Sequence, residues 1–142
     1  NKKVIVNLTN NPGGYIYEAL KFSALFVTSN NLIRLTDQNN QTLMVTRPKN
    51  HPYISVSQLI ILINKQTASA AEAAAYILSK HPQAIIVGKP SHGKTTITSQ
   101  MSQGSPYKSI NLPKGKIYPD YTINLPVISQ TSLLKLISQI NP

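Results

Sequence analysis

Apolar residues recur along the chain in two patterns, short continuous runs and longer stretches with apolar positions three or four residues apart. A short run bounded by turn residues predicts a buried strand, and the longer spacing predicts a helix with one face on a sheet. The predicted strands are 3–8, two within 30–44 around a turn at 37–40, 58–63, 84–87, 109–112 and 117–121. The predicted helices are 15–27, the alanine-rich segment 69–80 and a closing segment at 132–140.

The alternation of strands and helices, without an internal repeat, predicts a single α/β domain over residues 1–142. A chain of 142 residues with 41% hydrophobic residues is long enough to bury a core. No apolar run reaches the roughly 18 residues of a membrane span. The segment 10–14 predicts a turn, and the segment 47–53, with two prolines and three basic residues that we expect to be exposed, predicts a loop.

The composition is strongly basic, since 14 Lys and Arg residues and four acidic residues give a net charge of +10. Such a charge favours nucleic acids or anionic surfaces as partners. However, the basic residues are scattered singly, only 6% of residues are aromatic, and no nucleic-acid-binding motif is present. We therefore interpret the charge as a solvated surface and expect no specific nucleic-acid partner.

Metal and disulfide chemistry is not expected either. The chain has no cysteine, which excludes disulfides and thiolate metal ligands. The three histidines, His51, His81 and His92, have no partner at ligand spacing. We expect neither a metal nor another cofactor.

A phosphate-loop pattern, G-x-x-x-x-G-K-T, is formed by Gly88, Gly93, Lys94 and Thr95. In a nucleotide hydrolase this loop opens a helix whose N-terminus faces the phosphates, and a carboxylate at the end of a strand holds Mg²⁺. Here the segment 95–98 holds three threonines and an isoleucine, which favour a strand. None of the four acidic residues ends an apolar strand, so we expect no nucleotide partner.

A second candidate for chemistry lies where the strand 58–63 is followed by a turn and a helix that starts at Ser69. Ser69 and Glu72 form the pattern S-x-x-E, which is typical of a capping box that satisfies free amides at a helix start. A serine at this place can also project its hydroxyl while helix N-terminal amides stabilise developing negative charge. Both interpretations can hold together, with Glu72 fixing the turn.

Three segments that each follow a predicted strand resemble, taken together, motifs of the tail-specific, or carboxy-terminal processing, peptidases of family S41. They are NNPGG at 10–14, TASAAE at 67–72 and G-x-x-x-x-G-K at 88–94. A later segment, KIYPD at 116–120, resembles a turn of the same family. The resemblance extends to about Val127 and implies a crotonase/ClpP-like α/β core of layered sheet and helix.

The resemblance also implies roles for single residues. Ser69 is matched to the nucleophile of a Ser/Lys dyad, and Lys94, 25 residues downstream, to its general base. Amides of Gly13 or Gly14 and of Ala70 are matched to the oxyanion hole. A serine hydroxyl needs an adjacent base, and a lysine serves as one only where burial lowers its pKa. We expect the neighbouring apolar strands to supply that environment.

The chain departs from the family pattern at several positions. Asn7 and Thr9 stand where the family has Asp and Arg, and Thr95 replaces a Gly. Thr98 is found where many members have a glutamine that orients the lysine amine, and we count it with Glu72 as a supporting residue. These departures leave open an alternative, a catalytically degenerate binding or scaffolding domain with the same fold.

The implied function is that of a serine endopeptidase that cleaves proteins near their C-termini. Its partner would be a protein or peptide substrate with an apolar C-terminal tail, and a homo-oligomer is compatible with the family. The implied location is extracytoplasmic, in the bacterial periplasm or cell envelope. The PDZ module and the N-terminal helical region that usually precede this core do not occur in residues 1–142, so we expect them in a longer parent chain.

Overall fold

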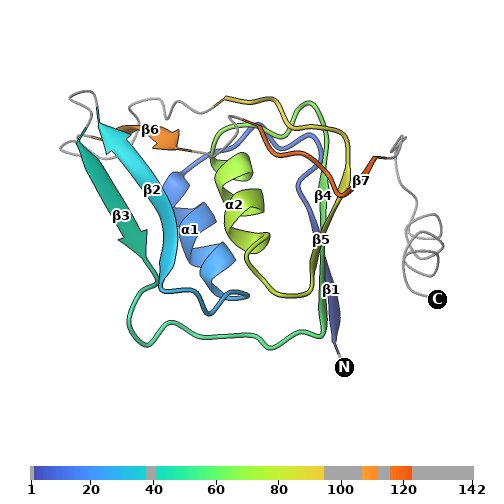
Figure 1. Cartoon of the computed structure of the whole chain (residues 1–142), viewed down its shortest axis with the longest axis horizontal. Helices are drawn as coiled ribbons and strands as arrows, with labels where there is room; N and C mark the ends of the chain where they lie inside the picture. The colour runs from blue at the N-terminus through green and yellow to red at the C-terminus, as the bar shows by residue number, and fades with distance from the viewer. Residues whose placement is uncertain (1, 38–40, 95–106, 112–115, 123–142) are drawn as a thin grey trace.

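Two sheets enclose two helices in the computed structural model, which describes residues 2–37, 41–94, 107–111 and 116–122. The first sheet is parallel and has the order β1-β4-β5-β7, with β1 at Lys3–Asn7, β4 at Gln58–Ile63, β5 at Ala84–Gly88 and β7 at Tyr121–Thr122. The second is antiparallel and has the order β3-β2-β6, with β3 at Thr42–Thr46, β2 at Asn31–Asp37 and β6 at Tyr107–Asn111. Helices α1 (Ile16–Ala24) and α2 (Ala70–Leu78) lie between the sheets (Figure 1). The predicted α/β class is confirmed.

The central place of β4 in the parallel sheet explains why this strand appears in the sequence as a continuous apolar run. β4 pairs on one side with β1 and on the other with β5, and all six of its residues are buried. A parallel strand covered on both faces has no solvent side and therefore no polar alternation. The runs at 3–8, 58–63 and 84–87 were predicted as strands, and each is confirmed to within one residue at either end. The first and last residues of β1 are exposed, so only β4 is buried along its whole length.

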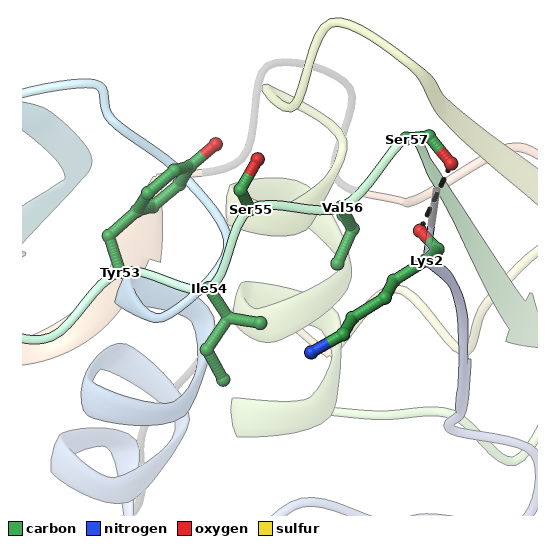
Figure 2. A pocket seen from close by; sticks show the side chains of 6 residues that line it. All are labelled: Lys2, Tyr53, Ile54, Ser55, Val56 and Ser57. Atoms are coloured by element: carbon green, nitrogen blue, oxygen red, sulfur yellow. Dashed lines mark hydrogen bonds between the residues drawn. The ribbon is translucent and has the colours of Figure 1, made fainter.

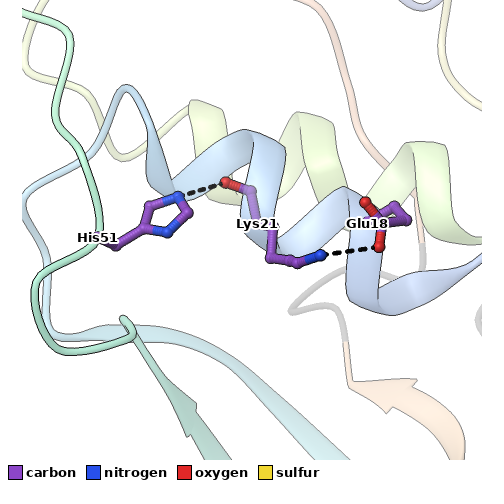
Figure 3. A network of polar contacts seen from close by, with 3 residues as sticks. All are labelled: Glu18, Lys21 and His51. Carbon is purple, nitrogen blue, oxygen red and sulfur yellow. Dashed lines mark hydrogen bonds and ion pairs between the residues drawn. The ribbon is translucent and has the colours of Figure 1, made fainter.

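The two helices pack against each other, and α2 also packs against β4 of the parallel sheet. Every residue of α2 except Tyr76 is buried, because its alanines allow close approach on all sides. α1 buries a single face and exposes the other. On the exposed face, the Nζ atom of Lys21 lies 3.0 Å from Oε1 of Glu18, and Nε2 of His51 lies 2.9 Å from the carbonyl oxygen of Lys21 (Figure 3).

α1 ends at Ala24, three residues before the predicted end, and the side chain of Arg47 explains the difference. Its Nε donates to the carbonyl oxygens of Ala24 (3.3 Å) and Val27 (3.1 Å), and Nη2 donates to those of His51 (2.8 Å) and Pro52 (3.1 Å). The last carbonyls of a helix need such donors. The predicted loop at 47–53 is confirmed, but the expectation that Arg47 is exposed was wrong.

The predicted strand at 117–121 was also wrong in most of its length, since β7 begins only at Tyr121. Pro119 has no N–H to donate to a strand pair. The side chain of Asp120 takes a ladder position instead, because its Oδ2 accepts from the amide of Ile86 at 2.7 Å while its own amide donates to the Ile86 carbonyl at 2.8 Å. The strand-like segment 95–98 and the predicted closing helix 132–140 lie outside the described residues.

Candidate active site

Three loops meet at one edge of the parallel sheet, where β1, β4 and β5 end. Parallel strands place their carboxyl ends at the same edge, so the segments 8–14, 64–69 and 89–94 are brought together. The amide of Ala68 donates to the carbonyl of Asn11 at 3.0 Å, and the amide of His92 donates to the carbonyl of Thr67 at 2.9 Å. The three segments that the sequence singled out are therefore neighbours.

Ser69 occupies a strained turn directly before α2. Its φ of 54° and ψ of −121° lie outside the extended region of an ordinary N-cap residue. A non-glycine residue with positive φ persists only where the surrounding structure holds it, and such residues gather at functional sites. The amide of Ser69 donates to Oε2 of Glu72 at 2.9 Å, so Glu72 takes part in capping the helix as its spacing indicated.

Gly13 packs directly against the Ser69 turn. A Cβ atom built on Gly13 would lie 2.8 Å from the Ala68 carbonyl oxygen and 2.9 Å from the Ala70 amide nitrogen, and Gly13 has a φ of +103°. Only glycine fits there. The amide of Gly13 is occupied, since it donates to Oδ1 of Asn11 at 2.9 Å. Within the described ranges the amides of Gly14 and Ala70 have no acceptor, which leaves these two available to an oxyanion.

The fully buried carboxylate of Glu72 joins the Ser69 turn to the loop that precedes Lys94. Besides the Ser69 amide on Oε2, its Oε1 accepts from the Ser91 hydroxyl at 2.5 Å and from the Gly93 amide at 2.6 Å. Among the described residues no cation pairs with this carboxylate, and three hydrogen-bond donors compensate its buried negative charge. Glu72 thereby supports two loops, whereas its spacing predicted only a helix cap.

Sequence reasoning missed Ser91, a residue that is 2% exposed and whose hydroxyl lies between two hydrogen-bond partners. The amide of Ile117 donates to Ser91 Oγ at 2.8 Å, and the Ser91 amide donates to the Ile117 carbonyl at 2.9 Å. Because Oγ accepts from Ile117, its proton is free to be donated to Glu72. A serine two residues before a glycine carries no sequence signal for this role, since both partners are distant in the chain.

The phosphate-loop pattern does not form a phosphate cradle in its described part. The amides of Lys89, Ser91, His92 and Gly93 each donate to an acceptor within the chain: Ile63 O, Ile117 O, Thr67 O and Glu72 Oε1. A phosphate cradle needs such amides free and convergent. The carboxylate of Glu72 occupies the place at the Gly93 amide that an anionic ligand would need.

Lys94 is exposed to solvent, and within the described residues its Nζ forms no hydrogen bond to Ser69. It nevertheless follows directly on Gly93, whose amide shares the Glu72 carboxylate with the Ser69 amide. The Ser69–Lys94 dyad stays a prediction, and Thr98 lies outside the described part of the chain. No group of three His, Asp or Glu side chains in the described ranges is placed to bind a metal ion.

Two pockets are candidates for substrate binding. One, of about 240 Å³, is lined by Gly13, Gly14 and Ala70 together with side chains of α1 and α2. A larger one, of about 670 Å³, lies between Lys2 and the segment 53–57 (Figure 2). None of the residues around the larger hollow belongs to the three loops at the sheet edge. The smaller pocket is therefore the one that adjoins the candidate chemistry.

Known proteins are similar to this chain in sequence and in fold. The sequence model of peptidase family S41 matches residues 1–123. The tail-specific protease of Haemophilus influenzae is 30% identical over 120 residues, which are 84% of this chain and 17% of that protein. The chain thus spans less than a fifth of that relative's length.

Solved structures show the same fold. The photosystem II D1 C-terminal processing protease superposes with a TM-score of 0.70 and 22% identity, over 86% of this chain and 34% of that one. A lipoprotein from Streptococcus agalactiae superposes with a TM-score of 0.70 and 20% identity, over 97% of this chain and 55% of that one.

Proposed function

Because the chain belongs to peptidase family S41, we propose that it is the catalytic core of a serine endopeptidase that cleaves proteins near their C-termini, with Ser69 as nucleophile and Lys94 as general base. The observation that carries the proposal is the shared carboxylate of Glu72. It accepts from the amides of both Ser69 and Gly93, so it keeps the turn of the nucleophile beside the residue that precedes the base.

The proposed reaction runs through a covalent intermediate. Neutral Lys94 accepts the proton of the Ser69 hydroxyl while Oγ attacks the scissile carbonyl carbon. The oxyanion is held by the amides of Gly14 and Ala70, because the Gly13 amide is already bonded to Asn11. As the C–N bond breaks, Lys94 returns the proton to the leaving amine, and water then hydrolyses the acyl-enzyme by the same route.

The substrate and the location follow from the family and are likewise proposals. A protein or peptide with an apolar C-terminal tail is the substrate class, and the compartment is extracytoplasmic, in the periplasm or cell envelope. The names of the relatives support this, since one is a tail-specific protease and one a lipoprotein. None of the helices among the described residues is long and apolar enough to span a bilayer.

Substitutions of the dyad test the proposal through cleavage of an unfolded protein or a quenched peptide. Ser69→Ala, Lys94→Ala and Lys94→Arg should each abolish turnover, since a guanidinium stays protonated at any usable pH and dyad members act as a unit. In the wild type, kcat/KM measured over about pH 6 to 10 should rise and then level off within that range, because only the neutral amine of a lysine with a lowered pKa accepts the proton. Lys65→Ala, an exposed lysine in the β4–α2 turn, is the matched control and should cleave normally.

A second candidate is favoured by one observation, the exposure of Lys94 without a bond to Ser69. In that case the domain is a non-catalytic binding or scaffolding module. Cleavage that persists in Ser69→Ala or Lys94→Arg would rule out the dyad. A wild type that binds tail peptides but never cleaves them would establish the module instead.

A further inference from the structure

The loop that carries the Gly14 amide and the loop that carries Ser69 are joined by the side chains of two asparagines, Asn10 and Asn64. We propose that Asn64 is a positioning residue for the proposed peptidase reaction, and that it holds the candidate oxyanion amide of Gly14 in place relative to Ser69. This inference rests on the proposed function, because it assumes attack by Ser69 and an oxyanion at Gly14.

The hydrogen bonds between the two asparagines run in both directions. The amide of Asn10 donates to Oδ1 of Asn64 at 3.0 Å, and Nδ2 of Asn64 donates to Oδ1 of Asn10 at 2.9 Å. Oδ1 of Asn64 also accepts from the backbone amide of Gln66 at 3.0 Å. Because backbone amides only donate, the two of them fix which end of the Asn64 side chain is the oxygen. One oxygen atom therefore binds a residue of each loop.

The backbone of Asn10 is held in an unusual conformation by these bonds. Its φ of 61° lies in the left-handed region, which asparagine tolerates better than most residues other than glycine. Such a conformation persists where the surrounding structure holds it. Asn10 is exposed, so packing contributes little, and the two bonds to Asn64 tie it to the neighbouring loop.

The direction of the Gly14 amide depends on where the chain leaves Asn10. The carbonyl of Asn11 accepts from the amide of Ala68 at 3.0 Å, and Oδ1 of Asn11 accepts from the amide of Gly13 at 2.9 Å. Asn64, through Asn10, fixes the residue at which this turn begins. A shift of about 1 Å in a group that the reaction uses can cost about a hundredfold in rate, so the start of the turn affects catalysis.

The backbone of Asn64 is anchored separately from its side chain. Thr67 is fully buried, and its hydroxyl donates to the carbonyl of Leu8 at 2.8 Å while it accepts from the amide of Asn64 at 2.9 Å. The half-buried side chain of Asn64 extends from this anchored backbone to Asn10. The side chain can therefore be changed while Thr67 still holds the turn that leads to Ser69.

Asn64→Leu removes the three side-chain hydrogen bonds. Per folded molecule, it should lower kcat on a quenched peptide by about 10- to 100-fold with little change in KM, because the oxyanion forms only after binding. A peptide boronate forms a tetrahedral adduct on Ser69 with an oxygen at the oxyanion amides, and its affinity should fall by a similar factor. Gln66→Leu is the matched control and should change neither value, because Gln66 bonds to Asn64 through its backbone amide and its side chain is exposed.

Carboxylate substitutions test the two asparagines without a change in size. Asn64→Asp keeps an acceptor for both backbone amides, and the side chain of Asn10 can turn over to donate to it, so this variant should keep most of the wild-type kcat. Asn10→Asp still accepts from Nδ2 of Asn64 and should behave alike. In the double variant two carboxylates face each other with no donor between them, and its loss of kcat should exceed the product of the single losses by about tenfold.

An Asn64→Leu variant that cleaves as fast as Gln66→Leu, or that loses kcat while its boronate affinity is unchanged, would overturn the assignment and leave the peptidase standing. Single losses that simply multiply in the double carboxylate variant would also overturn it, and this measurement decides if Asn64→Leu does not fold. A wild type that neither cleaves any peptide nor lets a fluorophosphonate label Ser69 would overturn the proposed function together with the assignment.

Discussion

At the scale of single residues, the carboxylate of Glu72 is the centre of the site. It is fully buried and accepts from Ser69, Ser91 and Gly93, which belong to the two loops that hold the candidate nucleophile and base. A buried hydrogen-bonded anion is sensitive to each donor, because a lost donor leaves charge uncompensated in a medium of low dielectric. The hydroxyl of Ser91 is the donor that can be changed with the least effect on the backbone.

Ser91→Thr and Ser91→Val form a matched pair, since the two new side chains have the same shape and only threonine keeps the hydroxyl. The valine variant leaves Glu72 Oε1 and the Ile117 amide each short of a partner. We expect it to be less stable than the threonine variant by about 1–3 kcal/mol in urea unfolding, and to lose kcat because the residue before Lys94 is no longer held. Equal stability and equal kcat in the two variants would remove Ser91 from the site.

At the scale of elements, the end of α1 depends on one side chain from a distant loop. Arg47 bonds four carbonyl oxygens, two at the helix end and two in the loop at 51–52, and so joins the helix to the chain that leads into β4. A guanidinium presents its donors in a rigid fork, which a single ammonium cannot reproduce. A change in the position of α1 would therefore also alter the site, because residues of α1 line the pocket beside the Ser69 turn.

Replacement of Arg47 should therefore destabilise the domain. Arg47→Met should cost about 2 kcal/mol in urea unfolding, and Arg47→Lys should recover only part of it. The measurement includes hydrogen exchange, in which the amides at the end of α1 should lose protection first. Lys49→Met removes an exposed charge from the same loop and should be near neutral; an Arg47→Met variant as stable as this control would show that the four bonds contribute nothing.

At the scale of the whole molecule, the net charge of +10 is a source of repulsion in the folded state. Within the described residues one ion pair is formed, between Lys21 and Glu18, and it lies on the surface. Repulsion among like charges acts more strongly in a compact state than in an extended one. Salt screens this repulsion over distances of about 10 Å at 0.1 M.

Raising the NaCl concentration should consequently raise the Tm of the domain. The increase should occur mainly between about 20 and 300 mM, where screening changes most, and an equal osmolality of sucrose separates screening from solute exclusion. A Tm that falls with NaCl would mean that favourable charge pairs outweigh the repulsion.

The sequence by itself determined the elements and the segments that hold the site. The strands and helices could be predicted because their signal is local. The pattern of apolar residues within a short segment indicates which face of a strand or helix is buried, and this pattern was visible in β1, β4, β5, α1 and α2. The motifs around Gly13, Ser69 and Lys94 were likewise visible as segments, each after a strand, and parallel pairing alone then places them at one edge.

Only the tertiary structure decided which polar groups meet. Ser91 reaches Glu72 across 19 positions and Ile117 across 26, Arg47 reaches back to α1, and Asp120 takes a place in the ladder of β5 that the apolar pattern had assigned to a strand. The proposal of the Gly14 amide, and not the Gly13 amide, as an oxyanion donor also depends on the tertiary structure, because the Gly13 amide donates to Oδ1 of Asn11. Hydrophobic periodicity indicates which residues face the core. A hydrogen bond instead needs a donor and an acceptor about 3 Å apart with the N–H or O–H pointing at the acceptor, and the path of the whole chain decides which groups meet in this way.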